Sequence, residues 1–444
     1  MMNEDLFSLF KSLDIYALFE VMADLVDNDI AVADIVDFIK AGQIAFMAQI
    51  TKCITLAGTD QKYQNMGPIW ANVKQEIDYT FALLNSVVQT FMESDIKASK
   101  RHFNMMMNSI KQDIFLETMS GEVPETLFRD GRYLQIFRQS FGRKFYRVRR
   151  MDNGNWDVNQ PDELFHLPNH LQSQASRGRY SCPDIPSLYL TTNIDLGVNE
   201  CGNPSKYAFS EFQSNYLGYS FSKFNDSLEV IILAIYHPLA VCCWSKINEG
   251  HSSEYWISIL IRYLKTFPLI LACSMKKSDK RSIEQAYIVP QLLMQWVVEN
   301  KDFCDGILYF SKSADIKKII DVYEYNIALP AIPPFDEKGH SVNLKKLLRW
   351  STPKLKQDNT EIISVLTITT QNDKNREFIR LCTWLQDHHV TFSELFDKDI
   401  KGVKIMLRQW SGVIDIRDTS CIKFVLHEFE PKTLAKKLEA YGIL

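Results

Sequence analysis

The sequence lacks the short signatures of the commoner enzyme classes. It contains no Gly-rich P-loop, no Gly-x-Gly-x-x-Gly, no His-Glu-x-x-His and no Gly-x-Ser-x-Gly. Those patterns supply phosphate-binding backbone, a dinucleotide-binding turn, a pair of zinc ligands and a nucleophilic serine. Their absence argues against P-loop nucleotide hydrolases, Rossmann dehydrogenases, zincin proteases and α/β-hydrolases.

Paired cysteines and a membrane-like run are also missing. The nine cysteines are odd in number and scattered, with no Cys-x-x-Cys pair, so we expect reduced thiols in a cytoplasmic protein and no zinc or redox site. The most apolar run, residues 256–275, contains Arg262, Lys265 and Pro268. It predicts a buried helix followed by a strand over Leu269–Cys273, and not a membrane span. Acidic residues at positions 4 and 5 stand where a signal peptide would be basic.

An excess of basic charge is absent too. The formal net charge is −4 at pH 7, whereas a nucleic-acid-binding protein is usually basic, so we expect no nucleic-acid partner. The composition, 46% hydrophobic and 23% charged, is that of an ordinary globular protein. A chain of 444 residues is long enough for two or three domains.

What the first part of the chain does contain is helical periodicity. Two apolar stripes recur at steps of three and four residues, the first being Trp70, Val73, Ile77, Phe81, Leu84, Val88 and Phe91, the second Phe103, Met106, Ile110 and Ile114. Such spacing lines one face of a helix. We therefore predict that residues 1 to about 118 are helical, with a helical hairpin, inside an N-terminal domain over 1–135.

After a breaker cluster at 120–124, residues 141–150 are strand-like and dense in arginine. Because side chains alternate along a strand, Arg147 shares one face with Phe145 and Arg149. A solvated surface charge is the alternative reading of each of these arginines.

The stretch 179–200 combines several reactive residue types. It opens on an Arg-Tyr-Ser triplet at 179–181, and residues 187–192 then alternate as a short strand carrying Tyr189. A helix that follows would carry Glu200 about two turns in. Arginine on a loop, tyrosine on a strand and an acid on a helix can converge on a substrate with phosphates, a flat ring and a ribose. A surface acid and a packed aromatic are the alternatives for Glu200 and Tyr189.

Further along, Leu228–Tyr236 and Asp305–Tyr309 predict buried strands, and 283–298 predicts an apolar helix between them. Ser311 lies just beyond the second strand, where functional groups commonly sit. After prolines at 330, 333 and 334, we predict an α/β accessory region over 336–444 without a catalytic constellation.

Four of these pieces, in this order, resemble the RES family, which is named for its Arg, Glu and Ser residues. They are Phe145–Arg149, Arg179–Glu200 with its Ile-Pro-Ser-Leu-Tyr-Leu core, Tyr287–Trp296 and Asp305–Ser311. The resemblance covers roughly residues 140–325 and implies an α+β fold. We expect an ADP-ribosyltransferase-like RES core of mixed β-sheet with flanking helices over 136–335, preceded by the helical domain.

The resemblance implies a toxin enzyme whose substrate is NAD, working in a toxin–antitoxin or phage-defence setting. It would cleave the bond between nicotinamide and ribose as a glycohydrolase or phosphorylase. Carried over by position, Glu200 stabilises positive charge that develops on the ribose. Arg147 and Arg179 engage the phosphates, for which the forked guanidinium suits Arg better than Lys.

The remaining carried-over positions concern the ring and its ribose. Tyr180 and Tyr189 would bracket them, and Ser311 would hydrogen-bond near the nicotinamide ribose, with Ser313 and Ser210 as alternative serines. The nicotinamide is already cationic before it leaves, so it needs no general acid. No metal is expected, because the sequence contains no cluster of metal ligands.

Two other functions stay open at this point. One is ADP-ribosyl transfer to a macromolecular acceptor. The other is a catalytically silent interaction protein that keeps the fold and binds a partner, such as an antitoxin, through its helical N-terminus.

Overall fold

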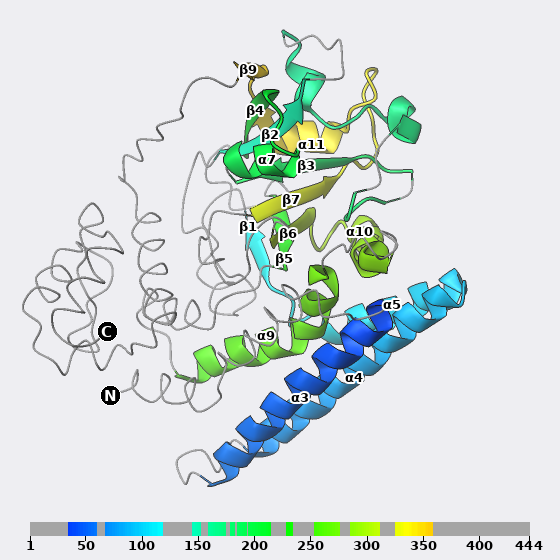
Figure 1. Ribbon diagram of the computed structural model, residues 1–444, viewed down its shortest axis with the longest axis vertical. Helices are drawn as coiled ribbons and strands as arrows, with labels where there is room; N and C mark the ends of the chain where they lie inside the picture. Colours follow the sequence, from blue (N-terminus) through cyan, green and yellow to red (C-terminus); the bar gives the residue numbers. More distant parts are fainter. Residues whose placement is uncertain are drawn as a thin grey trace, which may run out of the picture.

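The computed structural model describes residues 34–59, 67–118, 144–151, 159–174, 178–182, 184–192, 194–214, 228–233, 253–275, 285–310 and 325–357. In this part of the chain, long helices form one side of the molecule and a mixed sheet forms the other (Figure 1). Two apolar helices, α9 (Ser253–Ser274) and α10 (Ile288–Glu299), lie between them. The predicted α+β class is therefore confirmed.

The predicted helical hairpin is confirmed as well. After α3 (Ile35–Thr59), the helices α4 (Gly67–Met92) and α5 (Ile96–Ile110) pack side by side. Their apolar stripes are buried, with Phe81 and Met106 fully enclosed. Asp95 caps α5, because its side chain accepts a hydrogen bond from the Ala98 amide at 2.9 Å. The side chain of Trp70 lies outside the described part of the chain.

Helix α9 corrects the strand that was predicted over Leu269–Cys273. The helix runs without interruption through Pro268 to Ser274. A short, continuously apolar run fits a buried strand and a buried helix equally well, and periodicity alone does not separate them. Here the run is enclosed by other helices: the Phe267 ring stacks on Phe46 of α3 at 4.0 Å between centroids.

The sheet has nine strands within the described residues, in the order β1-β5-β6-β7-β3-β2-β4-β8, with β9 also paired to β4. Only β5 and β6 are parallel among the pairs of named strands. The bounds are β1 Leu116–Thr118, β2 Phe145–Arg150, β3 Ser187–Thr191, β4 Lys206–Ser214, β5 Glu229–Ile232, β6 Gly306–Phe310, β7 Tyr325–Pro330, β8 Leu348–Trp350 and β9 Lys354–Gln357.

Strand β1 corrects the end of the helical region. The sequence predicts helix as far as about residue 118, but Leu116 pairs with Ile231 and extends the edge of the sheet. Three residues are too few for an alternation to be read from sequence, and only the neighbouring strand β5 makes them a strand.

The strands predicted around the central stretch are present. Strand β3 coincides with the predicted 187–192 segment, β5 lies within Leu228–Tyr236, and β6 lies one residue beyond the predicted Asp305–Tyr309 bounds. The predicted helix over 283–298 appears as a 3-10 turn, η5 (Gln285–Tyr287), followed by α10. All six residues of β7 are buried, as expected for a central strand.

The last described residues belong to the same sheet. Strands β8 and β9 both pair with β4, and the short helix α11 (Val342–Leu347) leads into β8. Two 3-10 helices, η2 (Pro161–Leu164) and η3 (Asn169–Gln174), lie in the connection between β2 and β3. None of the helices in the described ranges combines the length and apolarity needed to cross a membrane.

Candidate functional site

Strand register assigns the polar side chains in the middle of the sheet to one face. Tyr189 on β3 is opposite Ala328 on β7, and Asn326 on β7 is opposite both Thr191 on β3 and Tyr309 on β6. Residues directly opposite each other, and residues two apart on one strand, share a face. Tyr189, Tyr309 and Asn326 therefore project from the same side, which we call the tyrosine face.

The helix that carries Glu200 packs on this tyrosine face. Helix α7 (Ile194–Glu200) approaches the sheet closely at Gly197, where a Cβ atom would lie 2.4 Å from Cγ2 of Val148. The helix ends because Gly202 adopts a left-handed conformation, φ +78°, and the Asn203 amide bonds back to the Val198 carbonyl at 3.0 Å. Gly197 thus allows α7 to lie close to the sheet, and Gly202 allows the helix to end.

This placement brings Glu200, the last residue of α7, to the sheet. The Asn326 side-chain amide donates from Nδ2 to Oε1 of Glu200 at 2.9 Å, although 126 residues separate them. Asn326 is buried and Glu200 is exposed. The pair therefore joins the interior of the sheet to the surface, with a carboxylate whose position is held by an amide.

The two carried-over tyrosines surround the same place. Tyr180 is fully buried, and its ring lies 4.4 Å from that of Tyr309. Tyr189 directs its hydroxyl at the chain segment before Arg179, since a Cβ on Gly178 would come within 2.5 Å of that oxygen. Burial raises the pKa of all three phenols, so each is a neutral hydrogen-bonding group at physiological pH.

Arg179 is buried beside these tyrosines, but its terminal nitrogens are engaged. They donate to the backbone carbonyls of Cys273 and Met275, at the C-terminal end of α9. A cation at this end also suits the helix dipole. Its guanidinium lies 5.9 Å from the centre of the Tyr287 ring. A phosphate could use these nitrogens only by replacing the two carbonyl oxygens.

Three buried polar atoms in this region have no hydrogen-bond partner among the described residues. They are Nε of Arg179, the hydroxyl of Tyr189 and Oδ1 of Asn326. An unsatisfied buried polar atom costs about 1–3 kcal/mol, so native proteins contain few of them. Unpartnered polar atoms on one side of a sheet, next to a held carboxylate, have the composition expected of a ligand-binding site.

Arg147 does not join this group. Register places it on the face opposite Tyr146, and it donates from a terminal nitrogen to the Phe165 carbonyl at 2.5 Å. Burial, with a further contribution from the like charge of Arg149, lowers its pKa to about 10, so it stays protonated at neutral pH. The two arginines expected to engage phosphates thus lie on different sides of the sheet.

The serine positions divide in the same way. Ser311 and Ser313 lie outside the described residues. Ser210 is buried on β4 directly opposite Arg147, which places it on that second face and away from the Glu200–Asn326 pair. Its hydroxyl has no partner among the described residues.

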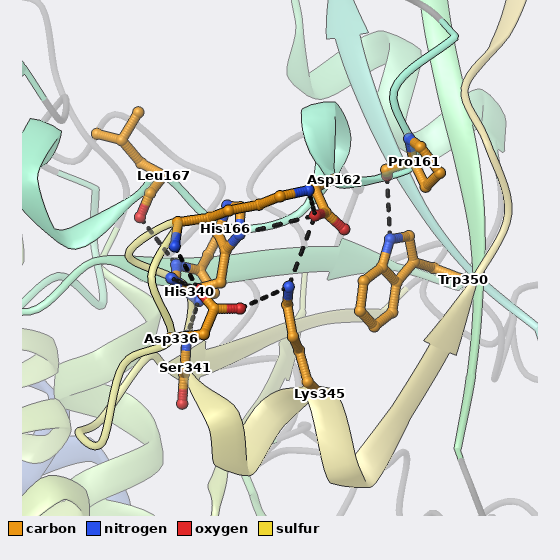
Figure 2. A network of polar contacts seen from close by, with 10 residues as sticks. Pro161, Asp162, His166, Leu167, Asp336, His340, Ser341, Lys345 and Trp350 are labelled. Carbon is orange, nitrogen blue, oxygen red and sulfur yellow. Dashed lines mark hydrogen bonds and ion pairs between the residues drawn. The ribbon is translucent and has the colours of Figure 1, made fainter.

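The second face carries a polar network of its own, shown in Figure 2. His166 is held at both ring nitrogens: Nε2 accepts from the Ser341 amide and Nδ1 pairs with the Leu167 carbonyl, each at 2.8 Å. Lys345 lies 2.8 Å from Asp336 and 3.6 Å from Asp162. Burial lowers the pKa of His166 to about 4, so the ring is neutral. This network ties the η2–η3 segment to the segment around α11.

Asn326 and Tyr309 are the site residues that sequence reasoning missed. The sequence places Tyr309 in a predicted strand and assigns it no role in the site. Asn326 is a polar residue within the otherwise apolar run of β7, Tyr-Asn-Ile-Ala-Leu-Pro at 325–330. A lone amide in a continuously apolar strand was therefore the available signal. Within the described ranges, no group of three or more His, Cys, Asp or Glu side chains is placed to hold a metal ion.

Comparison with known proteins yields one informative similarity. Over 239 residues the chain is 24% identical to a protein of Bacillus subtilis (strain 168) named "Putative toxin YopC", and the match covers 50% of each chain. The chain therefore spans about half the length of that relative. No family model matches the sequence, and no solved structure matches the fold.

Proposed function

We propose that this chain is an NAD-consuming toxin that cleaves the bond between nicotinamide and ribose. The observation that supports it most is the Glu200–Asn326 pair on a face that also carries Tyr180, Tyr189 and Arg179. Apart from Asn326, these residues are four of the six positions that the family resemblance selects. The similarity to a protein named as a toxin supports the toxin part of the proposal.

The proposed reaction needs few protein groups. The bond between C1′ of the ribose and the pyridinium nitrogen breaks, and its electron pair goes to the nitrogen, which becomes neutral. Positive charge develops on the ribose and is taken up when an oxygen of water or phosphate bonds to C1′, with loss of a proton where the acceptor is water. No general acid is required for the leaving group.

Glu200 acts on the ribose in this scheme. Its carboxylate accepts a hydrogen bond from a ribose hydroxyl and stabilises the developing positive charge. Asn326 positions the carboxylate, because the amide bond to Oε1 restricts its rotation. The buried phenols of Tyr180 and Tyr189 stay neutral. Both offer flat ring surfaces, and Tyr189 also offers its hydroxyl group.

Of the two arginines, only Arg179 is proposed to contact the substrate. Arg179 keeps the end of α9 against the sheet and presents its free Nε–H to the substrate. Arg147 is left out of substrate contact, because it is bound to the Phe165 carbonyl on the second face. The role of Ser311, and a protein partner at the helical N-terminal region, stay predictions.

The test is to incubate the purified full-length chain with NAD and to follow free nicotinamide by chromatography. We expect nicotinamide release that a chelator does not reduce. Loss of the activity with chelator and its return with zinc or magnesium would contradict the proposed site. Release that occurs only with added macromolecules, with label transferred to them, would favour the ADP-ribosyltransferase alternative. No release under any of these conditions would favour a catalytically silent protein.

A further inference from the structure

The side-chain amide of Asn326 has one end that is hydrogen-bonded and one end that has no partner among the described residues. The residue is 4% exposed, on the central strand β7. A carboxylate only accepts hydrogen bonds, so the contact to Glu200 fixes the amide with Nδ2 toward Oε1. The other end, Oδ1, is then fixed as a buried acceptor without a partner among the described residues.

The groups around Asn326 define what could satisfy that oxygen. Tyr309 is directly opposite on β6, and its ring packs against the tilted ring of Tyr180. The Tyr189 side chain, whose hydroxyl has no partner among the described residues, projects from the same face. The Nε–H of Arg179 is a second unpartnered donor. A ligand group that fits must offer an N–H to Oδ1 and an acceptor oxygen to a phenol or guanidinium donor, next to aromatic rings.

A primary carboxamide on an aromatic ring has both functions in one plane. A carboxylate at the same place would have no proton for Oδ1 and would stand close to the charged Glu200. We propose that Oδ1 of Asn326 accepts a hydrogen bond from the carboxamide of the nicotinamide ring, so that the site accepts nicotinamide and rejects nicotinate. This inference rests on the proposed function and specifies the substrate it takes.

The test uses three small rings as probes of the full-length chain: nicotinamide, nicotinate and 3-acetylpyridine. The last keeps the carbonyl and replaces the NH₂ by a methyl group, so it removes only the donor to Oδ1. We expect nicotinamide to bind roughly tenfold or more tightly than either other ring, as measured by calorimetry or by product inhibition. Equal affinity for nicotinamide and 3-acetylpyridine would overturn the inference.

A substitution then assigns the preference to Asn326. Asn326→Leu keeps a similar volume and removes both amide atoms, and Asn326→Ser is a milder second variant. Both should slow NAD cleavage, because Glu200 loses its positioning group, and both should reduce the preference for nicotinamide over 3-acetylpyridine toward one. Asn300→Ala, which removes an asparagine side chain at the end of α10 that bonds to the Trp296 carbonyl, should leave the preference unchanged.

The outcomes separate this inference from the proposed function. If the wild-type chain cleaves NAD and cleaves nicotinic acid adenine dinucleotide at the same kcat/KM, the function stands and the carboxamide inference is wrong. If a folded Asn326 variant keeps the full preference, the inference is likewise wrong. If the wild-type chain neither cleaves NAD nor binds nicotinamide, the proposed function itself fails.

Discussion

The two faces of the sheet both bury polar groups, but they differ in how those groups are satisfied. On the second face, His166 is bonded at both ring nitrogens, and the carboxylates of Asp162 and Asp336 are paired with Lys345 and Lys338 (Figure 2). On the tyrosine face, the Tyr189 hydroxyl and one end each of Asn326 and Arg179 have no partner in the described part of the chain. The second face still holds two buried polar atoms without a hydrogen-bond partner among the described residues, the hydroxyl of Ser210 and Nδ1 of His340, but its charged groups are paired. On the tyrosine face, the atoms without a partner lie beside the Glu200 carboxylate, as expected of a site that binds a ligand.

This difference has an energetic meaning. Hydrogen bonds within the protein contribute to its stability. A buried polar atom without a partner lowers the stability, and this loss is offset only when a ligand supplies the missing hydrogen bond. Substitutions on the second face should therefore alter the free energy of unfolding. Substitutions on the tyrosine face should alter turnover and ligand binding more than stability.

The largest effect on stability is expected at Phe165. Its ring is fully buried and stacks on Trp350 at 4.3 Å between centroids. Phe165→Ala should lower the free energy of unfolding by about 3–5 kcal/mol, because it removes this stacking and leaves a cavity. Denaturant titration measures the change. Leu355→Ala, at a side chain that is 55% exposed, is the control and should change it by less than about 0.5 kcal/mol.

Glu200→Gln should show the reverse pattern. The change removes the charge and keeps the size, so we expect a roughly hundredfold or greater fall in NAD turnover, about 3 kcal/mol in the activation barrier. NAD affinity and the free energy of unfolding should change little. Glu299→Gln is a matched control, since Glu299 also ends a helix and pairs with Lys100 at the surface. Wild-type turnover in Glu200→Gln would show that the carboxylate is structural.

Acid should destabilise the second face through His166. The pKa is lowered to about 4 in the folded protein, against an ordinary value of 6.5, so between these values the unfolded chain binds a proton that the folded one does not. The free energy of unfolding should fall by up to about 3 kcal/mol as the pH drops through this window.

The histidine contribution must be isolated from a carboxyl group that acts in the opposite direction. Burial raises the pKa of Asp305 to about 7, so its protonation favours the folded state over an overlapping pH range. The measurement is therefore a difference: denaturant titrations of the wild type and of His166→Gln between pH 7 and pH 4. A pH dependence that is identical in the two proteins would contradict the assignment.

The smallest effect is expected at the exposed edge of the second face. Lys345 bridges Asp336 and Asp162, but each of these side chains is more than a fifth exposed. Lys345→Met should lower the free energy of unfolding by only about 0.2–1 kcal/mol, because solvent screens such pairs. A double-mutant cycle with Asp336→Asn measures the pair itself. A coupling well above this range would mean that the network is held more rigidly than its exposure suggests.

Local pattern was enough to predict many of the elements. The stripe from Val73 to Val88 specifies one face of α4, since spacing of three and four residues permits only one buried side. The alternation of apolar and polar residues around Tyr189 specifies β3. The helix predicted after this strand carries Glu200. Each of these depends on residues close together in sequence, so each could be read before any packing was known.

Contacts between distant segments decided the rest. Whether Leu269–Cys273 is helix or strand depended on the helices that enclose it. The opposite positions of Arg147 and Arg179 depended on strand register and on the end of α9. Glu200 and Asn326 belong to two elements far apart in the sequence, and no local pattern predicts that they pair. The sequence by itself determined which side chains each element carries. The tertiary structure alone determined which of them meet, because register and helix packing are set by the burial of the whole sheet.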